Sequence, residues 1–152
     1  MMPDAPIFYA EDDENDIFFL KHAFQTVGIT NPMRVARTGQ EAIQYLSRIG
    51  SLSDSSSFPP PCLIILDLKM PVINGMEVLS WLRRSSGLPA FPVIVFSSSP
   101  QARDVELALE LGANAFVVKP HAMEQRIALA LSIKEFWLRF NQPHPASMQP
   151  AE

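Results

Sequence analysis

The chain has 152 residues, of which 47% are hydrophobic, and a formal net charge of -4, which together favour one folded domain. The acidic balance and the scattered Lys and Arg residues argue against nucleic-acid binding, and no apolar run approaches the roughly 18 residues that a membrane-spanning helix needs. No leader follows Met1, so we expect a cytoplasmic protein, and a single cysteine, Cys62, excludes an internal disulfide or a thiolate zinc site.

The first part of the chain predicts two strand and helix pairs. Residues 7–10 form a short apolar run that is typical of a buried strand, and it ends at Glu11-Asp12-Asp13. Apolar residues then recur at helical spacing as far as Val27, with Asp13 as the expected cap and Gly28 just past the end. A weaker strand over residues 33–36 and a helix over residues 39–48 follow.

The middle of the chain contains the strongest predicted strand. A segment rich in Ser and Pro, residues 50–61, predicts a long loop before it. Residues 63–66 are then entirely apolar, as a central parallel strand buried on both faces must be, and they end at Asp67. A third helix over residues 75–84 leads to a fourth strand over residues 93–96, which ends at Ser97.

The last part predicts a helix over residues 101–111, a strand over residues 115–118 and a long helix over residues 123–140. Lys119-Pro120 closes the strand. Residues 141–152 are rich in Pro and polar residues, and we expect a disordered tail. The folded domain is therefore expected to span residues 1–140.

Five strands that alternate with five helices predict an α/β protein with a parallel sheet covered on both faces. We expect the flavodoxin-like, doubly wound strand order 2-1-3-4-5. In such a sheet, ligands bind beyond the carboxyl ends of the strands, where the strand order reverses.

Polar residues end four of the predicted strands: Glu11 and Asp12, then Asp67, Ser97 and Lys119. Three carboxylates this close are unstable unless a cation neutralises them or a pKa rises. Oxygen ligands without a Cys or His set are typical of Mg²⁺. Taken alone, residues 11–14 fit a solvated helix start better than a metal site. Together with Asp67, they favour a metal site.

Asp67 directly follows a buried strand, where its carboxylate can attack phosphorus and form an acyl phosphate. A bound metal would stabilise the phosphoryl oxygens during in-line transfer. Lys119 can add a positive charge and Ser97 a hydroxyl donor, although an exposed strand end and an ordinary Ser-rich turn are the plain alternatives for these two residues.

The order of these motifs resembles the receiver domains of bacterial two-component systems. The resemblance covers about residues 5–133 and depends on the acidic pair, Asp67-Leu68-Lys69-Met70-Pro71 followed by Gly75, then Ser97 and Lys119-Pro120. It implies that Asp67 is the phosphoacceptor and that Glu11, Asp12, Asp67 and the backbone carbonyl of Lys69 hold Mg²⁺. It also implies a switch at Ser97 and Phe116, a phosphate-binding Lys119 and a cis peptide at Pro120.

The resemblance also implies partners, namely a sensor histidine kinase and a downstream phosphotransfer or effector protein. Residues 11–16, the Ser/Pro-rich loop and Glu135-Phe136-Trp137-Leu138 are similar to single-domain regulators encoded with bacterial phytochromes. We further expect a symmetric homodimer through helix four, strand five and helix five, because the last helix has a broad apolar stripe that includes Ile133, Phe136, Trp137 and Phe140. The stripe could instead pack on the sheet.

Two other functions are compatible with parts of this pattern. A haloacid-dehalogenase-type phosphatase also uses an Asp nucleophile with Mg²⁺, but it needs a second Asp two residues later as general acid, and Lys69 stands there. A phosphorylation-independent interaction module would have no need for the acidic pair, Asp67 and Lys119 together. Apart from its own phosphorylation and dephosphorylation, we expect no enzymatic activity.

Overall fold

The computed structural model describes residues 5–49 and 59–142, and these form an α/β fold around a parallel five-stranded sheet. The sheet order is β2-β1-β3-β4-β5, as predicted. The strands are β1 (Ile7–Ala10), β2 (Met33–Ala36), β3 (Leu63–Leu66), β4 (Val93–Ser97) and β5 (Ala115–Val118). The order reverses between β1 and β3, which pair directly in the middle of the sheet.

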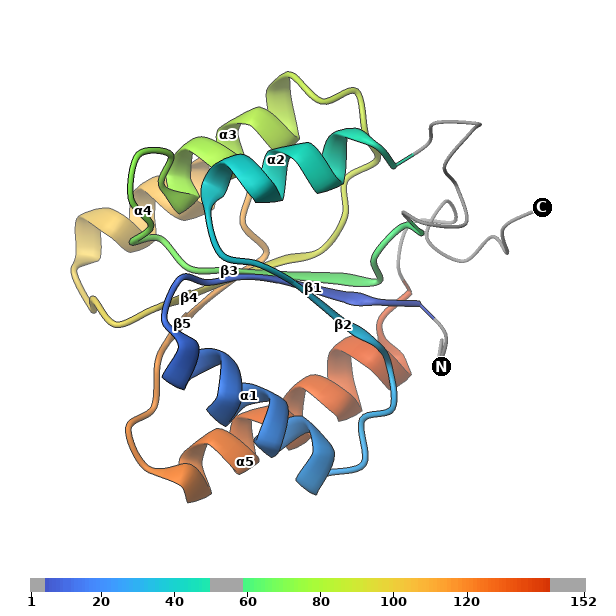
Figure 1. The fold of residues 1–152 in the computed structure, drawn as a ribbon. Coiled ribbons are helices and arrows are strands. Elements are labelled where there is room, and N and C mark those ends of the chain that lie inside the picture. Colours follow the sequence, from blue (N-terminus) through green and yellow to red (C-terminus); the bar gives the residue numbers. More distant parts are fainter. Residues whose placement is uncertain (1–4, 50–58, 143–152) are drawn as a thin grey trace.

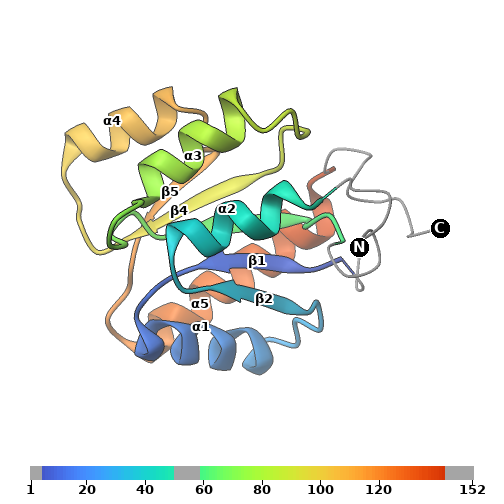
Figure 2. The same cartoon turned by 45° about the horizontal axis from the view of Figure 1, so that its top comes forward.

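Helices cover both faces of the sheet, as Figures 1 and 2 show. On one face lie α2 (Gly39–Ser47), α3 (Gly75–Arg84) and α4 (Ala102–Glu110). On the other face lie α1 (Glu14–Thr26) and α5 (Met123–Ser132), which pack against each other. This three-layer arrangement is the flavodoxin-like, doubly wound fold expected from the sequence.

Alternate residues of each central strand enter two separate hydrophobic cores. Phe8 and Ile64 belong to the core under α2, α3 and α4, whereas Tyr9 and Ile65 belong to the core under α1 and α5. Successive side chains of a strand point to opposite faces, so a strand between two helix layers must be apolar throughout. The polar residues that follow these strands therefore lie at the sheet edge.

Side chains fix the starts of the two helices nearest that edge. Asp13 caps α1, as predicted, and its side chain accepts hydrogen bonds from the backbone N–H groups of Asn15 and Asp16. Asn74 and Glu77 form a reciprocal capping box at the start of α3. Because these bonds satisfy N–H groups that have no partner inside a helix, each helix begins at a defined residue.

The end of the last helix differs from the prediction. A single helix was expected over residues 123–140, but α5 ends at Ser132 and a π-helix, η1 (Ile133–Phe140), continues it. Ile133 and Leu138 are five positions apart and both are buried. The wider turn of a π-helix, in which bonds join residues five apart, allows both side chains to face the same core.

Some predictions fall on residues outside the described ranges. These are most of the long loop over residues 50–61 and all but the first two residues of the tail over residues 141–152. Within the described residues, no helix is long and apolar enough to cross a membrane.

Candidate metal centre

The strand register places the predicted polar residues at one edge of the sheet. Ala10 of β1 is level with Leu66 of β3, so the next residues, Glu11 and Asp67, leave the sheet side by side. The backbone N–H of Asp67 donates to the carbonyl of Ala10 at 3.0 Å. At the next pair of strands, the N–H of Lys119 donates to the carbonyl of Ser97 at 2.8 Å. Four strand ends thus converge.

Three carboxylates meet at this edge. Glu11, Asp12 and Asp67 each offer an oxygen, and these oxygens all lie within 4.8 Å of one another. Glu11 is fully buried and Asp67 is 3% exposed, whereas Asp12 is exposed. The cluster therefore has a buried floor and an open side through which a ligand can enter.

Glu11 is held by two neighbours and has a perturbed pKa. The hydroxyl of Tyr9 donates to its Oε1 at 2.8 Å, and the ammonium of Lys119 lies 2.7 Å from the same oxygen. Burial, together with the nearby Asp67, raises the pKa of the Glu11 carboxyl from 4.5 to about 8. Negative charge in this pocket is thus only partly compensated by the protein.

The ammonium group of Lys119 contacts three carboxylates at this edge of the sheet. Its Nζ lies 2.7 Å from Glu11, 2.8 Å from Asp16 and 3.5 Å from Asp67. Burial alone would lower the pKa of this ammonium, but the bonds to Asp16 and Glu11 outweigh burial and raise it. Lys119 is therefore a permanent positive charge beside Asp67.

Sequence reasoning missed two members of this network, Asp16 and Arg126. Asp16 lies in the first turn of α1, and Arg126 of α5 is 8% exposed. Arg126 precedes the buried Ala130 and Ile133 by four and seven positions, so it lies on the same apolar stripe of the last helix. A cation on an apolar stripe is the sequence feature that could have indicated a buried ionic contact. No comparable signal distinguishes Asp16 from the exposed acids beside it.

The remaining predicted site residues lie around the cluster. Ser97 is fully buried at the end of β4, and its Oγ accepts from the backbone N–H of Ser99 at 3.1 Å. Phe116 of β5 is partly buried beside Val95 and packs against the core under α2, α3 and α4. Lys69 lies two residues after Asp67 in the loop between β3 and α3, with its side chain exposed.

Two predictions are wrong. The described residues contain no cis peptide bond, so the Lys119–Pro120 bond is trans. The trans form of an X–Pro bond is favoured by about 0.5–1 kcal/mol, and with it Lys119 already reaches its carboxylates. Ile133 was expected at a dimer interface, but it is 3% exposed because it faces the core under α1 and α5.

The donor set fits a hard divalent cation. Carboxylate oxygens are the ligands that Mg²⁺ and similar ions prefer, and a dication would relieve the crowding that raises the pKa of Glu11. The described residues contain no other group of three metal-ligating side chains of this kind. The geometry therefore supports the predicted oxygen-ligand metal site.

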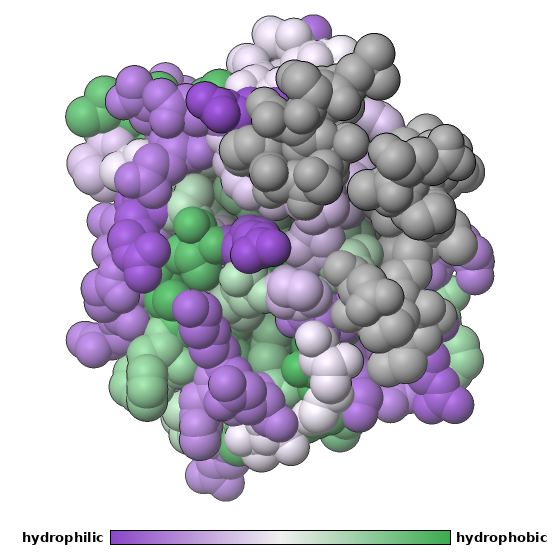
Figure 3. Space-filling view, turned by 45° about the vertical axis from the view of Figure 1, so that its right-hand side comes forward, coloured by the Kyte–Doolittle hydropathy of each residue, from purple (hydrophilic) through white to green (hydrophobic). Residues whose placement is uncertain are grey.

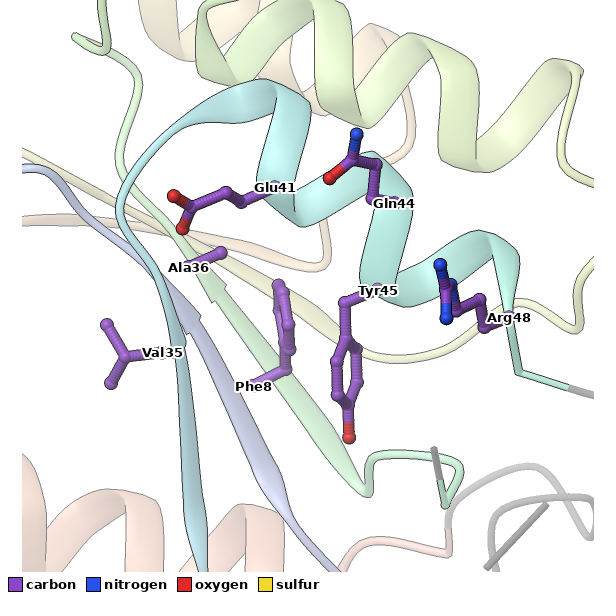
Figure 4. A pocket seen from close by; sticks show the side chains of 7 residues that line it. All are labelled: Phe8, Val35, Ala36, Glu41, Gln44, Tyr45 and Arg48. Atoms are coloured by element: carbon purple, nitrogen blue, oxygen red, sulfur yellow. The ribbon is translucent and has the colours of Figure 1, made fainter. Parts of the chain in front are cut away.

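A hollow of about 270 Å³ beside α2 is a poorer candidate for a reactive site. Figure 4 shows the rings of Phe8 and Tyr45 side by side, with Glu41 and Gln44 above them on α2. The centroids of the two rings are 4.9 Å apart. None of the predicted site residues lines it. The face in Figure 3 shows hydrophobic residues between hydrophilic ones.

Fold and site together define a class of protein. A doubly wound sheet carries a carboxylate cluster and a lysine at its carboxyl edge, where proteins of this fold bind ligands. Residues 7–131 match the family model of the response regulator receiver domain. The chain belongs to this family and is a response-regulator receiver domain.

Comparison with known proteins agrees with this assignment. "Probable methanogenesis regulatory protein FilR2" of Methanothrix harundinacea is 33% identical over 92% of this chain and 88% of its own. The Mn²⁺-bound response regulator Rcp1 of Synechocystis is 27% identical, with a TM-score of 0.79 over 92% of this chain and 99% of that one. The phosphorylated cyanobacterial phytochrome response regulator RcpA is 29% identical, with a TM-score of 0.81 over 92% and 98%.

Proposed function

We propose that Asp67 is the phosphoacceptor and that Glu11, Asp12, Asp67 and the backbone carbonyl of Lys69 hold Mg²⁺. The observation that supports this most directly is the cluster of three carboxylates within 4.8 Å, with Lys119 at 3.5 Å from Asp67. A bound Mg²⁺ would shield the charge of the incoming phosphoryl oxygens. The Mn²⁺-bound form of the similar response regulator Rcp1 supports binding of a divalent ion by this chain.

The transfer would take place between two side chains. A carboxylate oxygen of Asp67 attacks the phosphorus of a phosphohistidine on a sensor kinase, and the P–N bond breaks as the imidazole leaves and takes up a proton. Lys119 offers its charge to a phosphoryl oxygen. The buried position of Asp67 limits access of water to the resulting acyl phosphate.

The signal would leave the site through Ser97 and Phe116. In the structure, the hydroxyl oxygen of Ser97 accepts a hydrogen bond from the backbone N–H of Ser99. Phe116 is only partly buried. We infer that the hydroxyl turns to a phosphoryl oxygen and that the Phe116 ring moves into the vacated space. Phe116 has no hydroxyl, so a partner must recognise the position of its ring.

We propose a sensor histidine kinase of the phytochrome type as the donor, and a phosphotransfer or effector protein as the receiver of the signal. The similarity to Rcp1 and to the phytochrome response regulator RcpA supports this donor. The cytoplasmic location, the lack of nucleic-acid binding and the folded range 1–140 stay predictions.

Turnover as a phosphatase is the less favoured alternative. Lys69 stands where that reaction needs a carboxylic acid, and its side chain is exposed rather than directed at a leaving group. An interaction module that works without phosphorylation would not need Lys119 to be buried among acids, as it is here. Both observations favour a phosphoacceptor.

Intact mass after treatment with acetyl phosphate and Mg²⁺ tests the proposal. The wild-type chain should gain one phosphoryl group, and Asp67→Asn should gain none, because an amide cannot form the acyl phosphate. Asp13→Asn is the matched control, because Asn also caps helices well and Asp13 is exposed. Continuous phosphate release at enzymatic rates would favour the phosphatase, and an unmodified wild type would favour the interaction module.

A further inference from the structure

Asp16 is the partner of Lys119 that the proposed metal site does not use. Of the three carboxylates around the Lys119 ammonium, Glu11 and Asp67 belong to the metal cluster and Asp16 does not. The Asp16 contact, at 2.8 Å, is also a hydrogen bond donated by Nζ to Oδ2. Asp16 can therefore keep this contact while a cation occupies the other two carboxylates.

Arg126 holds Asp16 from its other side. Its Nη2 lies 3.5 Å from Oδ1 of Asp16, while its Nε donates to the carbonyl of Pro120 at 2.9 Å. The guanidinium also lies over the ring of Phe19, 4.8 Å from its centroid. With Arg126 only 8% exposed, the Asp16 carboxylate is fixed between a rigid cation from α5 and the flexible Lys119.

We propose that Asp16 is a positioning residue that holds the Lys119 ammonium beside Asp67 when a divalent cation engages Glu11. This inference rests on the proposed function of the site and assigns a role to a residue outside its metal and phosphate contacts. Three ion pairs then link α5, α1 and the strand ends: Arg126 with Asp16, Asp16 with Lys119, and Lys119 with Asp67.

The need for such an anchor follows from charge and chain length. A dication bound to Glu11 and Asp67 weakens the attraction of both carboxylates for an ammonium at 2.7 and 3.5 Å. A lysine side chain has four flexible methylenes and regains rotamer entropy when it is released. Without Asp16, the Lys119 side chain would point into solvent in a fraction of the molecules. It would then contact the phosphoryl group in fewer of them.

The test measures binding of beryllofluoride, a phosphoryl analogue, to the full chain with saturating Mg²⁺ by fluorine NMR, and of Mg²⁺ alone by calorimetry. Asp16→Asn should weaken beryllofluoride binding about tenfold, the size expected for one charge-assisted contact. Mg²⁺ binding should change less, because Asp16 does not belong to the metal cluster. The rate of phosphorylation by acetyl phosphate should fall in parallel with beryllofluoride affinity.

Two further variants make the result specific to the carboxylate of Asp16. Asp16→Glu should recover part of the affinity, because it restores the charge on a longer stem. Asp13→Asn removes an equal charge from the same end of α1 without contact to Lys119, and it should behave as wild type. Thermal unfolding of each variant shows that the fold is intact.

Unchanged beryllofluoride affinity in Asp16→Asn would overturn the inference. Tighter binding would overturn it too, because Asp16 would then compete with the phosphoryl group for Lys119. Either outcome leaves the proposed function standing as long as wild type is modified on Asp67. If wild type binds neither beryllofluoride nor a phosphoryl group, the proposed function itself has failed.

Discussion

At the scale of single residues, the site depends on charges that are costly to bury and are therefore placed in contact with one another. Glu11 is fully buried, and it is surrounded by the hydroxyl of Tyr9, the ammonium of Lys119 and the nearby Asp67. The first two favour its charged form, but burial and Asp67 oppose it more strongly. The metal-free pocket should therefore hold a proton that a divalent ion displaces.

The stability of the metal-free protein should fall as pH rises from about 4.5 to about 8, because the folded state binds the Glu11 proton more tightly than the unfolded state does. This stabilisation is fully present below the pKa that Glu11 has in the unfolded chain. It is lost as pH rises through the pKa of Glu11 in the folded protein. Glu11→Gln mimics the protonated carboxyl and should flatten this dependence. Thermal unfolding in EDTA across this range measures it, and equal pH dependence in both proteins would contradict the assignment.

At the scale of elements, the start of α3 lies in close contact with the backbone that follows β3. A Cβ on Gly75 would lie 2.2 Å from the carbonyl oxygen of Asp67 and 2.8 Å from the Cα of Leu68. Both are backbone atoms, which cannot move without shifting Asp67 itself. The close approach of α3 therefore helps to position Asp67.

Gly75→Ala should lower the free energy of unfolding by about 2 kcal/mol, the usual cost of overpacking, and should also weaken Mg²⁺ binding. Gly39→Ala is a matched comparison, because its Cβ would lie 2.2 Å from the carbonyl oxygen of Ile73 and does not touch Asp67. Urea unfolding and Mg²⁺ titration of both variants separate the effects. Normal metal affinity in a folded Gly75→Ala would show that α3 does not position Asp67.

At the scale of the whole molecule, several large apolar side chains of α4, β5, α5 and η1 are exposed. These side chains are Leu107 and Leu109 on α4, Val118 on β5, Leu131 on α5, and Phe136 and Phe140 on η1. Trp137 packs edge-on against Phe136, with ring centroids 5.1 Å apart, and is partly buried on the core. Exposed apolar side chains on these four elements favour an interface there.

We expect α4, β5, α5 and η1 to form the interface of a symmetric homodimer in solution, which would have twice the monomer mass by light scattering. Phe140→Ser, or Phe136→Ser, should shift the mass toward monomer, because each removes an exposed ring from the interface. Phe18→Ser is the matched control: Phe18 and Phe140 are both 64% exposed, but Phe18 lies on α1. A monomeric wild type, before and after phosphorylation, would contradict the dimer.

The sequence predicted the sheet order, the limits of α3, β1, β2, β3 and β5, and the residues at the strand ends. These features follow from local rules: a short apolar run between turn residues is typical of a buried strand, and parallel strands expose their carboxyl ends at one edge. The cluster of Glu11, Asp12 and Asp67 was predictable for the same reason.

Only the tertiary structure decided how distant charges share the pocket. Asp16 and Lys119 are 103 positions apart, and their contact, like that of Arg126, depends on how α1 and α5 pack on one face of the sheet. The burial of Ile133 by the π-helical winding of η1 depends on the same packing. Periodicity specifies which side chains face inward, whereas contacts between elements depend on their relative placement in space.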